Sequence, residues 1–258
     1  MNRDNYVIGV DFGTDSVRAV IVNAANGEEV SSAVFHYPLW KEGKYCDPAR
    51  NQFRQHPLDY LQGLEWTIQE SLREAPGYTA ERIRGLSVDT TGSTPVAVDE
   101  RGTPLSLLPE FSENPNAMFI LWKDHTAVHE AGEINALAKW WGGVDFTRFE
   151  GGVYSSEWFW SKMLHVLRTD RDIRRASFSW VEHCDWIPAL LTGDTNPLTL
   201  KRSRCAAGHK AMWHQSFGGL PSEEFLIKLD PLLKGIRARL YERTYTSDVS
   251  VGTLTPEG

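Results

Sequence analysis

The amino-terminal stretch constrains the fold most, because three short segments with β-strand patterns follow one another with only tight turns between them. Residues 6–10 and 17–22 are apolar runs, and residues 28–35 alternate enough to form a third strand. A polar turn at residues 11–16 separates the first two, and Asn26-Gly27, whose residues tolerate positive φ, joins the second to the third. Short apolar runs bounded by turn residues are typical of β-strands. We therefore expect three antiparallel strands, the first of them buried on both faces.

A helix is predicted after these strands. Residues 57–75 begin with Pro57, whose fixed φ suits a first helical turn, and Pro76-Gly77 ends the segment. Leucine and isoleucine recur in it at helical spacing, which predicts a buried stripe formed by Leu61, Leu64, Ile68 and Leu72. Residues 83–88 are the next strand candidate, so the chain opens with the order β-β-β-α-β.

The remaining sequence predicts a second hairpin and then mostly helices. The hairpin consists of two apolar runs around the turn 99–102, at residues 95–98 and 104–108. Apolar spacing predicts helices at residues 124–141, 155–175, 185–191 and 222–240. Ser155 or Ser156 is the expected N-cap of the second, a strand is expected at 177–183, and a loop at 208–219. Because no repeat or linker interrupts the chain, we expect one continuous domain over residues 1–258.

Composition argues against several classes of protein. The 258 residues carry a formal charge of −7, whereas nucleic acids and anionic membranes are bound mainly by Lys and Arg. No apolar run reaches the roughly 18 residues that a membrane span needs, and residues 1–6 lack the features of a signal peptide. Cys46, Cys184 and Cys205 are too few and too widely spaced for a disulfide framework. We therefore expect a cytoplasmic protein with no nucleic-acid or membrane partner.

The turn at residues 11–16 is the most informative local feature. Gly13 permits a close approach, Thr14 adds a hydroxyl donor, and Arg18 adds a cation. Backbone N–H groups in such a turn can point into one concavity that holds anionic oxygens. Asp11, at the strand end, can hold Mg²⁺ through water. The same residue types suit any hairpin turn, so the turn alone leaves both interpretations open.

Two further observations bear on a phosphate site. The Gly43-Lys44 pair is followed by Tyr45, so it does not form a Walker loop, and no Gly-x-Gly-x-x-Gly pattern occurs. A second turn of similar character, residues 89–94, follows the predicted strand 83–88. The two turns would reach the same cleft if both strands belong to one sheet, because ligands of α/β proteins bind at strand ends.

Longer segments carry a resemblance to a known family. Residues 7–19 resemble the first phosphate motif of sugar kinases in the actin and hexokinase superfamily. Further segments narrow the resemblance to the FGGY carbohydrate kinases and, among these, to the bacterial ribulokinases; they are residues 89–95, 109–111, 113–119, 121–127, 154–160 and 207–210. The similarity runs almost from end to end, and the longer segments are too specific to arise from composition.

The resemblance implies a fold and an activity. The implied fold is an α/β, ribonuclease-H-like mixed sheet flanked by helices, which agrees with the order β-β-β-α-β. The implied activity is Mg²⁺-assisted transfer of the γ-phosphoryl group of ATP to the 5-hydroxyl of L-ribulose, as in L-arabinose catabolism. ATP and Mg²⁺ are therefore the implied cofactors, and L-ribulose is the implied sugar substrate.

The resemblance also implies roles for single residues. On the phosphate side they are Asp11 for the metal and, facing the phosphates, Gly13, Thr14 and Arg18. Trp122 and Lys210 resemble the hydrophobic wall and the hydrogen-bond donor of the sugar pocket. Gly92 and Ser93 would line the same pocket through their backbone. A ketopentose, with its many hydroxyl groups, needs such fixed donors and an apolar face.

One departure from the family bears on activity. In FGGY kinases the aspartate that accepts the substrate proton lies in a Gly-rich segment soon after the region that residues 251–254 resemble, and no such segment precedes Gly258. The family's second domain, which holds adenine, is also expected to be missing. We assign no catalytic residue and give neither Asp89 nor Asp124 the role of base. The chain alone is expected to be inactive and, with a docking surface exposed, prone to form a homo-oligomer.

Two alternatives stay open. A kinase for xylulose or a ribitol-derived ketose would share the fold and differ in its pocket, whereas a non-catalytic actin-like module would bind nucleotide without sugar. Other signals favour packing or solvation over chemistry. His125 and His129 share a predicted helix face without the glutamate of a zinc-protease motif. Trp158 and Trp160 suit a core or an interface better than a sugar platform.

Overall fold

The computed structural model describes residues 4–77 and 79–256, and the contacts among them group the chain into two compact units. The first unit comprises the amino-terminal stretch up to Tyr45 together with His56–Thr91. The second comprises Cys46–Gln55 and the chain from Gly92 onward. No linker or shift in composition in the sequence marks the places where the chain passes from one unit to the other.

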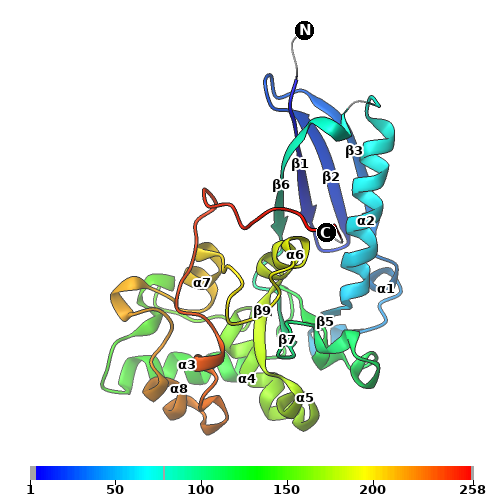
Figure 1. Cartoon of the computed structure of the whole chain (residues 1–258). Coiled ribbons are helices and arrows are strands. Elements are labelled where there is room, and N and C mark those ends of the chain that lie inside the picture. Colours follow the sequence, from blue (N-terminus) through cyan, green and yellow to red (C-terminus); the bar gives the residue numbers. More distant parts are fainter. Residues whose placement is uncertain (1–3, 78, 257–258) are drawn as a thin grey trace. The chain divides into compact units, whose positions relative to one another are not determined.

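The first unit contains a mixed sheet (Figure 1). Its strands are, in spatial order, β3 (Glu29–His36), β2 (Ser16–Asn23), β1 (Tyr6–Phe12) and β6 (Ile83–Thr90). Strand β2 runs antiparallel to both β1 and β3, while β6 runs parallel to β1. The predicted order β-β-β-α-β and the predicted mixed sheet are therefore confirmed.

Helix α2 (Pro57–Glu74) lies along this sheet, as Figure 1 shows. The residues that it buries are mostly small or polar, and they include Tyr60, Gly63, Leu64, Thr67 and Ser71. The predicted stripe is therefore wrong by about one residue, because Leu61, Ile68 and Leu72 are only partly buried. The reason is the close approach at Gly63, where a Cβ atom would lie 2.5 Å from Val17 Cγ1 and 2.9 Å from Phe35 Cδ1.

Strand β1 is well buried on one face only, so the prediction of burial on both faces is wrong. The buried face carries Tyr6, Ile8, Val10 and Phe12, all at most 5% exposed. Phe12 contacts Tyr60 of α2, which places this face against the helix. Val7, on the opposite face, is 37% exposed. Asp11 lies on that second face, where polar side chains of the unit stay accessible.

The second unit contains two small sheets. Strand β7 (Pro95–Val98) pairs antiparallel with β9 (Ser179–Glu182), so that Pro95 faces Glu182 and Val98 faces Ser179. The other sheet has the order β4 (Cys46–Asp47), β5 (Gln52–Gln55) and β8 (Phe119–Ile120). The predicted second hairpin is wrong, since a single bridge joins Val98 to Pro104. Proline has no backbone N–H with which to extend that pairing.

Helices and loops make up the rest of the chain. A short helix, α1 (Pro38–Lys41), belongs to the first unit. The helices of the second unit are α3 (Val128–Trp140), α4 (Phe159–Thr169), α5 (Arg171–Ala176), α6 (His183–Thr192), α7 (Arg204–Lys210) and α8 (Glu223–Leu229). The strand predicted at 177–183 and the helix predicted at 185–191 are confirmed as β9 and α6, and Gly193 ends α6 with a φ of 72°.

Three predicted helices and one predicted loop have other bounds in the structure. The stretch 155–175 forms two helices, because the Asp170 carboxylate accepts backbone N–H groups and begins α5. The stretch 124–141 is helical only from Val128. Pro231 follows the end of the last predicted helix, 222–240, which stops at Leu229. The expected loop 208–219 overlaps the end of α7.

Aromatic side chains form much of the core of the second unit. Trp160 and Trp180 are fully buried, and the rings of Phe146 and Phe225 pack edge to face 5.1 Å apart. Packing therefore accounts for Trp160, as expected, whereas Trp158 is only partly buried. Within the part of the chain that the structure describes, no helix combines the length and apolar character needed to cross a bilayer.

Candidate functional site

The turn between β1 and β2 brings a glycine backbone next to a cation. The Gly13 N–H donates to the Ser16 carbonyl oxygen at 2.9 Å, which closes the turn. A Cβ atom on Gly13 would lie 3.2 Å from that oxygen and 3.5 Å from Arg18 Nη2, so a larger residue would crowd the guanidinium. Thr14 lies in the same turn and is partly exposed. The Thr14 hydroxyl and the Arg18 guanidinium, beside a turn without a side chain at Gly13, suit an anionic group.

Asp11 lies beside this turn on the accessible face of β1. In the strand register it pairs with Arg18 on β2 and with Asp89 on β6. Its Oδ2 atom is 3.7 Å from Arg18 Nη1, and its side chain is 49% exposed. An accessible carboxylate is the kind of ligand that Mg²⁺ takes through water, so Asp11 fits the metal role. Residues 4–77 and 79–256 hold no cluster of three or more His, Cys, Asp or Glu side chains suited to a metal.

The loop before β7 contains Gly92 and Ser93, which differ in their exposure to solvent. Gly92 is exposed, and a Cβ atom there would meet no other atom within 4 Å. Ser93 has no exposed surface, because its hydroxyl donates to Glu182 Oε1 and its carbonyl oxygen accepts from Lys162 Nζ at 2.7 Å. The adjacent Thr94 N–H donates to Glu182 Oε2 at 2.7 Å. Gly92 can therefore face a ligand directly, whereas Ser93 holds the loop in place.

Trp122 follows β8 and is 39% exposed. Close to it, Asp124 is fully buried and lies 3.4 Å from Arg54 Nε. The Asp124 carboxylate also accepts from the backbone N–H of Phe53 at 2.8 Å and of Thr126 at 3.0 Å. These contacts give Asp124 a structural role in supporting the segment that carries Trp122. They also leave Asp124 without exposed surface to meet a substrate.

Lys210 is the last residue of α7, and the structure places it over an aromatic ring. Its Nζ atom lies 5.4 Å from the centre of the Trp158 ring. The Tyr154 hydroxyl donates to the Lys210 carbonyl oxygen. Close by, Glu150 accepts from the Met212 N–H at 2.7 Å; burial raises the pKa of Glu150 to about 8, against the opposing effects of that hydrogen bond and of Lys210. Trp158 and Glu150 thus lie near Lys210. Their spacing in the sequence did not predict this proximity.

Lys162 and Glu182 are the residues that sequence reasoning missed. Both are buried, and burial lowers the pKa of Lys162 while it raises that of Glu182. The charges of Lys162 and Lys210 both act to lower the pKa of the Glu182 carboxyl group, against the larger effect of burial. A signal was present in the sequence, since Lys162 lies among the apolar residues of a strongly amphipathic helix. Its significance depends on partners far away in the sequence.

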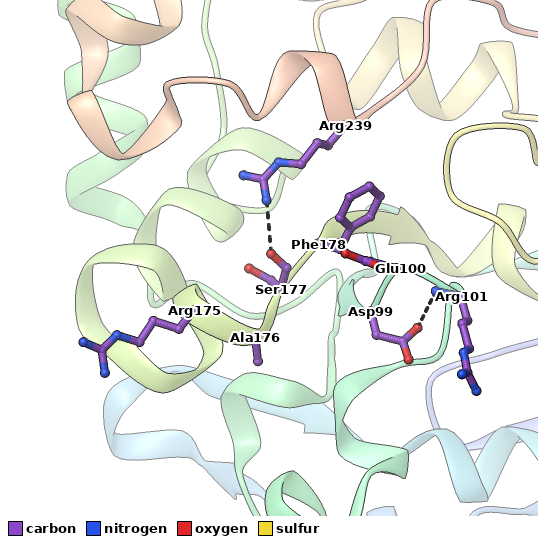
Figure 2. A pocket seen from close by; sticks show the side chains of 8 residues that line it. All are labelled: Asp99, Glu100, Arg101, Arg175, Ala176, Ser177, Phe178 and Arg239. Carbon is purple, nitrogen blue, oxygen red and sulfur yellow. Dashed lines mark hydrogen bonds between the residues drawn. The ribbon is translucent and has the colours of Figure 1, made fainter.

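A separate hollow lies at the other end of the β7–β9 sheet. Its lining includes Arg101, Arg175 and Arg239 (Figure 2). Figure 2 shows that the three guanidinium groups do not converge, and Arg239 donates to the Ser177 carbonyl oxygen at 3.3 Å. This end of the sheet, at Val98, is opposite the end that carries Ser93 and Glu182. The hollow is therefore separate from Ser93 and Glu182, and we assign it no ligand.

Comparison with curated proteins shows extended similarity to ribulokinases. The chain is 55% identical over 253 residues to a ribulokinase from Vibrio parahaemolyticus, which covers 98% of this chain and 45% of that protein. It is 36% identical over 234 residues to a ribulokinase from Halalkalibacterium halodurans, which covers 89% of the chain and 40% of the relative. The chain thus spans less than half of the length of these curated relatives.

Solved structures share the fold. A xylulose kinase from Rhodospirillum rubrum superposes with a TM-score of 0.72 at 19% identity, over 98% of this chain and 45% of that one. A glycerol kinase from Plasmodium falciparum, solved with ADP, superposes with a TM-score of 0.70 at 12% identity, over 98% of this chain and 46% of that one. The predicted fold class, an α/β mixed sheet flanked by helices, is confirmed by these superpositions and by the sheet of the first unit.

A family model describes most of the chain directly. Residues 6–196 match the N-terminal domain of the FGGY family of carbohydrate kinases. The matched range contains the turn at Gly13, the loop at Gly92 and the segment of Trp122. Lys210 lies outside that range, within the longer similarity to the Vibrio ribulokinase. The chain therefore belongs to the FGGY family of carbohydrate kinases, and its residues 6–196 correspond to the N-terminal domain of that family.

Proposed function

We propose that this chain is the sugar-binding part of an ATP-dependent ribulokinase. The reaction is transfer of the γ-phosphoryl group of ATP to the 5-hydroxyl of L-ribulose, a step of L-arabinose catabolism. The observation that carries the proposal is the 55% identity to a ribulokinase over 98% of this chain. An activity that draws on ATP and a sugar metabolite also favours a cytoplasmic location, which is part of the same proposal.

The sugar pocket of this proposal is formed in the second unit. Trp122 supplies an exposed apolar wall, and the exposed backbone of Gly92 supplies polar groups. Lys210 donates to sugar oxygens from its place over the Trp158 ring. A site with several fixed donors rejects a sugar that misplaces a hydroxyl group, since the unmatched donors lose their partners. L-ribulose and its epimers are therefore the informative ligands.

The phosphate site of this proposal is formed in the first unit. Thr14 offers a hydroxyl donor to phosphate oxygens and Arg18 offers a guanidinium, while Gly13, which lacks a side chain, leaves room for a phosphate beside them. Asp11 holds Mg²⁺ through water, and the cation, when bound, neutralises phosphate charge. Arg18 then has two roles, because it orients Asp11 in the free protein and meets phosphate oxygens in the complex.

As part of this proposal, the chain by itself binds the sugar but does not phosphorylate it. Phosphoryl transfer depends on positioning and on charge stabilisation from both sides of the transferred group. Among the described residues we assign no base for the sugar hydroxyl. Asp124 is fully buried beside Arg54, and Asp89 lies on the sheet of the first unit.

An ADP-coupled assay and calorimetry with L-ribulose, D-ribulose and D-xylulose test the proposal, with the Vibrio parahaemolyticus ribulokinase run alongside. We expect this chain to bind L-ribulose most tightly and to release no ADP above background. Turnover by this chain would place the base within its 258 residues and contradict our account of the missing base. Preference for D-xylulose would agree with the FGGY family but would show that L-ribulose is not the substrate. Nucleotide binding without binding of any sugar would favour the non-catalytic module.

A further inference from the structure

We propose that Lys162 is a positioning residue that sets the shape of the sugar pocket by joining its two walls, with Glu182 as its charge partner. This inference rests on the proposed function, because it takes a pentulose to be the ligand. Lys162 itself does not touch the sugar, since its side chain is 1% exposed. It acts through the backbone of the residues that do.

The hydrogen bonds of Lys162 link segments that are far apart in the sequence. Its Nζ atom donates to the carbonyl oxygens of Ser93 at 2.7 Å, Leu121 at 2.8 Å and Ile120 at 3.3 Å. Ser93 directly follows Gly92, and Leu121 directly precedes Trp122. One buried ammonium group therefore determines the separation of the backbone at Gly92 from the backbone at Trp122.

The geometry requires that Lys162 be protonated. An ammonium group has three N–H donors and no acceptor, which matches three carbonyl oxygens. A neutral amine has two donors, so its lone pair would face a carbonyl oxygen. Glu182 supplies the compensating charge on the other side of Ser93, where it accepts from the Ser93 hydroxyl and from the Thr94 N–H. Ser93 is therefore held from both sides.

The same helix end also holds the segment of Lys210. The Trp160 N–H, two residues before Lys162, donates to the Tyr154 hydroxyl at 2.9 Å, and that hydroxyl donates to the Lys210 carbonyl oxygen. The Trp160 indole N–H donates to the Ala211 carbonyl oxygen at 2.8 Å. The first turn of α4 thus supports all three segments that carry candidate sugar contacts. Lys162 is the charged member of this support.

The first test compares L-ribulose affinity with thermal stability in the Lys162→Met variant. We expect the dissociation constant to rise by about tenfold to hundredfold, because shifts of about 1 Å in a site have effects of that size. Lys228→Met, which removes a half-exposed lysine on α8, is the control and is expected to stay within about twofold. A folded Lys162→Met protein with unchanged affinity would overturn the inference. If the unchanged chain binds no pentulose, the proposed function itself fails.

The second test measures affinity against pH and uses Glu182→Gln, which keeps the length of the side chain. The glutamine oxygen can accept the Thr94 N–H while its NH2 group donates to the Ser93 hydroxyl oxygen, so the variant is expected to fold. Burial lowers the pKa of Lys162 and its neighbour Arg54 lowers it further, while Glu182, Asp124 and Glu157 raise it. L-ribulose affinity is therefore expected to fall as pH rises through the pKa of Lys162. Replacing the carboxylate in Glu182→Gln removes a charge that favours the ammonium, so the fall is expected at lower pH.

The charge of Lys210 also acts on the pKa of Glu182, so Lys210 needs its own control. Lys210→Arg keeps a positive charge that does not titrate in this range. An alkaline fall that persists in Lys210→Arg and moves to lower pH in Glu182→Gln supports the role of Lys162. If the fall disappears in Lys210→Arg, or does not move in Glu182→Gln, a group other than Lys162 causes it. Either result would overturn the role proposed for Lys162. If Lys162 were purely structural, Lys162→Met would lower the melting temperature, and the L-ribulose affinity of the folded protein would not show this fall with pH.

Discussion

The turn at Gly13 and the pocket around Gly92 are held in place by different kinds of contact. Asp11, Gly13 and Arg18 lie within one hairpin, and the ion pair of Asp11 with Arg18 is about half exposed. The segments proposed to form the sugar pocket come from distant parts of the chain and depend on charges that are almost wholly buried. Exposed ion pairs contribute little to stability, whereas breaking a buried pair leaves an uncompensated charge. A mutation should therefore disturb the second region far more than the first.

The largest effect is expected for Asp124→Ala in the second region. The substitution leaves Arg54 buried without its carboxylate partner and removes the acceptor of the Phe53 N–H. We expect the free energy of unfolding to fall by about 3–5 kcal/mol, as for other broken buried pairs. Urea unfolding followed by circular dichroism measures it. A loss below about 1 kcal/mol would mean that the pair of Asp124 with Arg54 contributes no more to stability than an exposed ion pair. The two regions would then not differ in how strongly their stability depends on charge.

The Glu150→Gln variant should change how stability depends on pH. Burial raises the pKa of Glu150 to about 8, well above its value in the unfolded chain, so the folded protein holds the proton more tightly. Stability from this group is therefore complete below the unfolded pKa and is lost as pH rises toward 8. We expect Glu150→Gln to match the unchanged protein in acid and to exceed its stability near pH 8. The measurement is the melting temperature of each protein from acid pH to about pH 8. Glu133→Gln, at a more exposed carboxylate, is the control.

Gly63→Ala tests packing in the first region. A Cβ atom there would lie 2.5 Å from Val17 Cγ1 and 2.9 Å from Phe35 Cδ1, so helix and sheet must separate. We expect a loss of about 1–3 kcal/mol, the usual range for overpacking. Gly85→Ala, on β6 of the same unit, is a matched control because its Cβ atom would meet nothing within 4 Å. Equal denaturation midpoints for the two variants would show that α2 can move away from the sheet without loss of stability.

The smallest effect is expected for Asp11→Ala. The carboxylate is 3.7 Å from Arg18 Nη1 and about half exposed, so its removal should change the free energy of unfolding by at most about 1 kcal/mol. Urea unfolding beside Asp124→Ala gives the direct comparison of an exposed with a buried aspartate. A loss as large as that of Asp124→Ala would show that the first region also depends on its charges for stability.

Much of the first unit could be predicted because its signals are local. Apolar runs with turns between them placed β1, β2 and β3, and proline and glycine placed the ends of α2. The buried stripe of α2 was displaced because hydrophobicity does not show how closely a helix approaches a sheet. At Gly63 the approach is so close that small residues, and not leucines, face the strands.

The second unit was harder to predict because its pairings are long-range. Residues 95–98 pair with a strand more than 80 positions away and not with the nearer run that periodicity favoured. In the sequence Asp124 was considered only as a catalytic base and was given no role, and Lys162 was not singled out. Their burial and their partners became visible only when the segments were brought together.

The sequence by itself determined the order of the first elements, the residues of the turn at Gly13 and the resemblance to the FGGY kinases. Each of these depends on neighbours along the chain, where spacing and backbone preference act directly. Only the tertiary structure decided that Ser93 is buried, that Lys210 lies over Trp158, and that Lys162 joins Ser93 to Leu121. A buried charge acquires its role from the groups that replace water around it, and those groups come from distant segments.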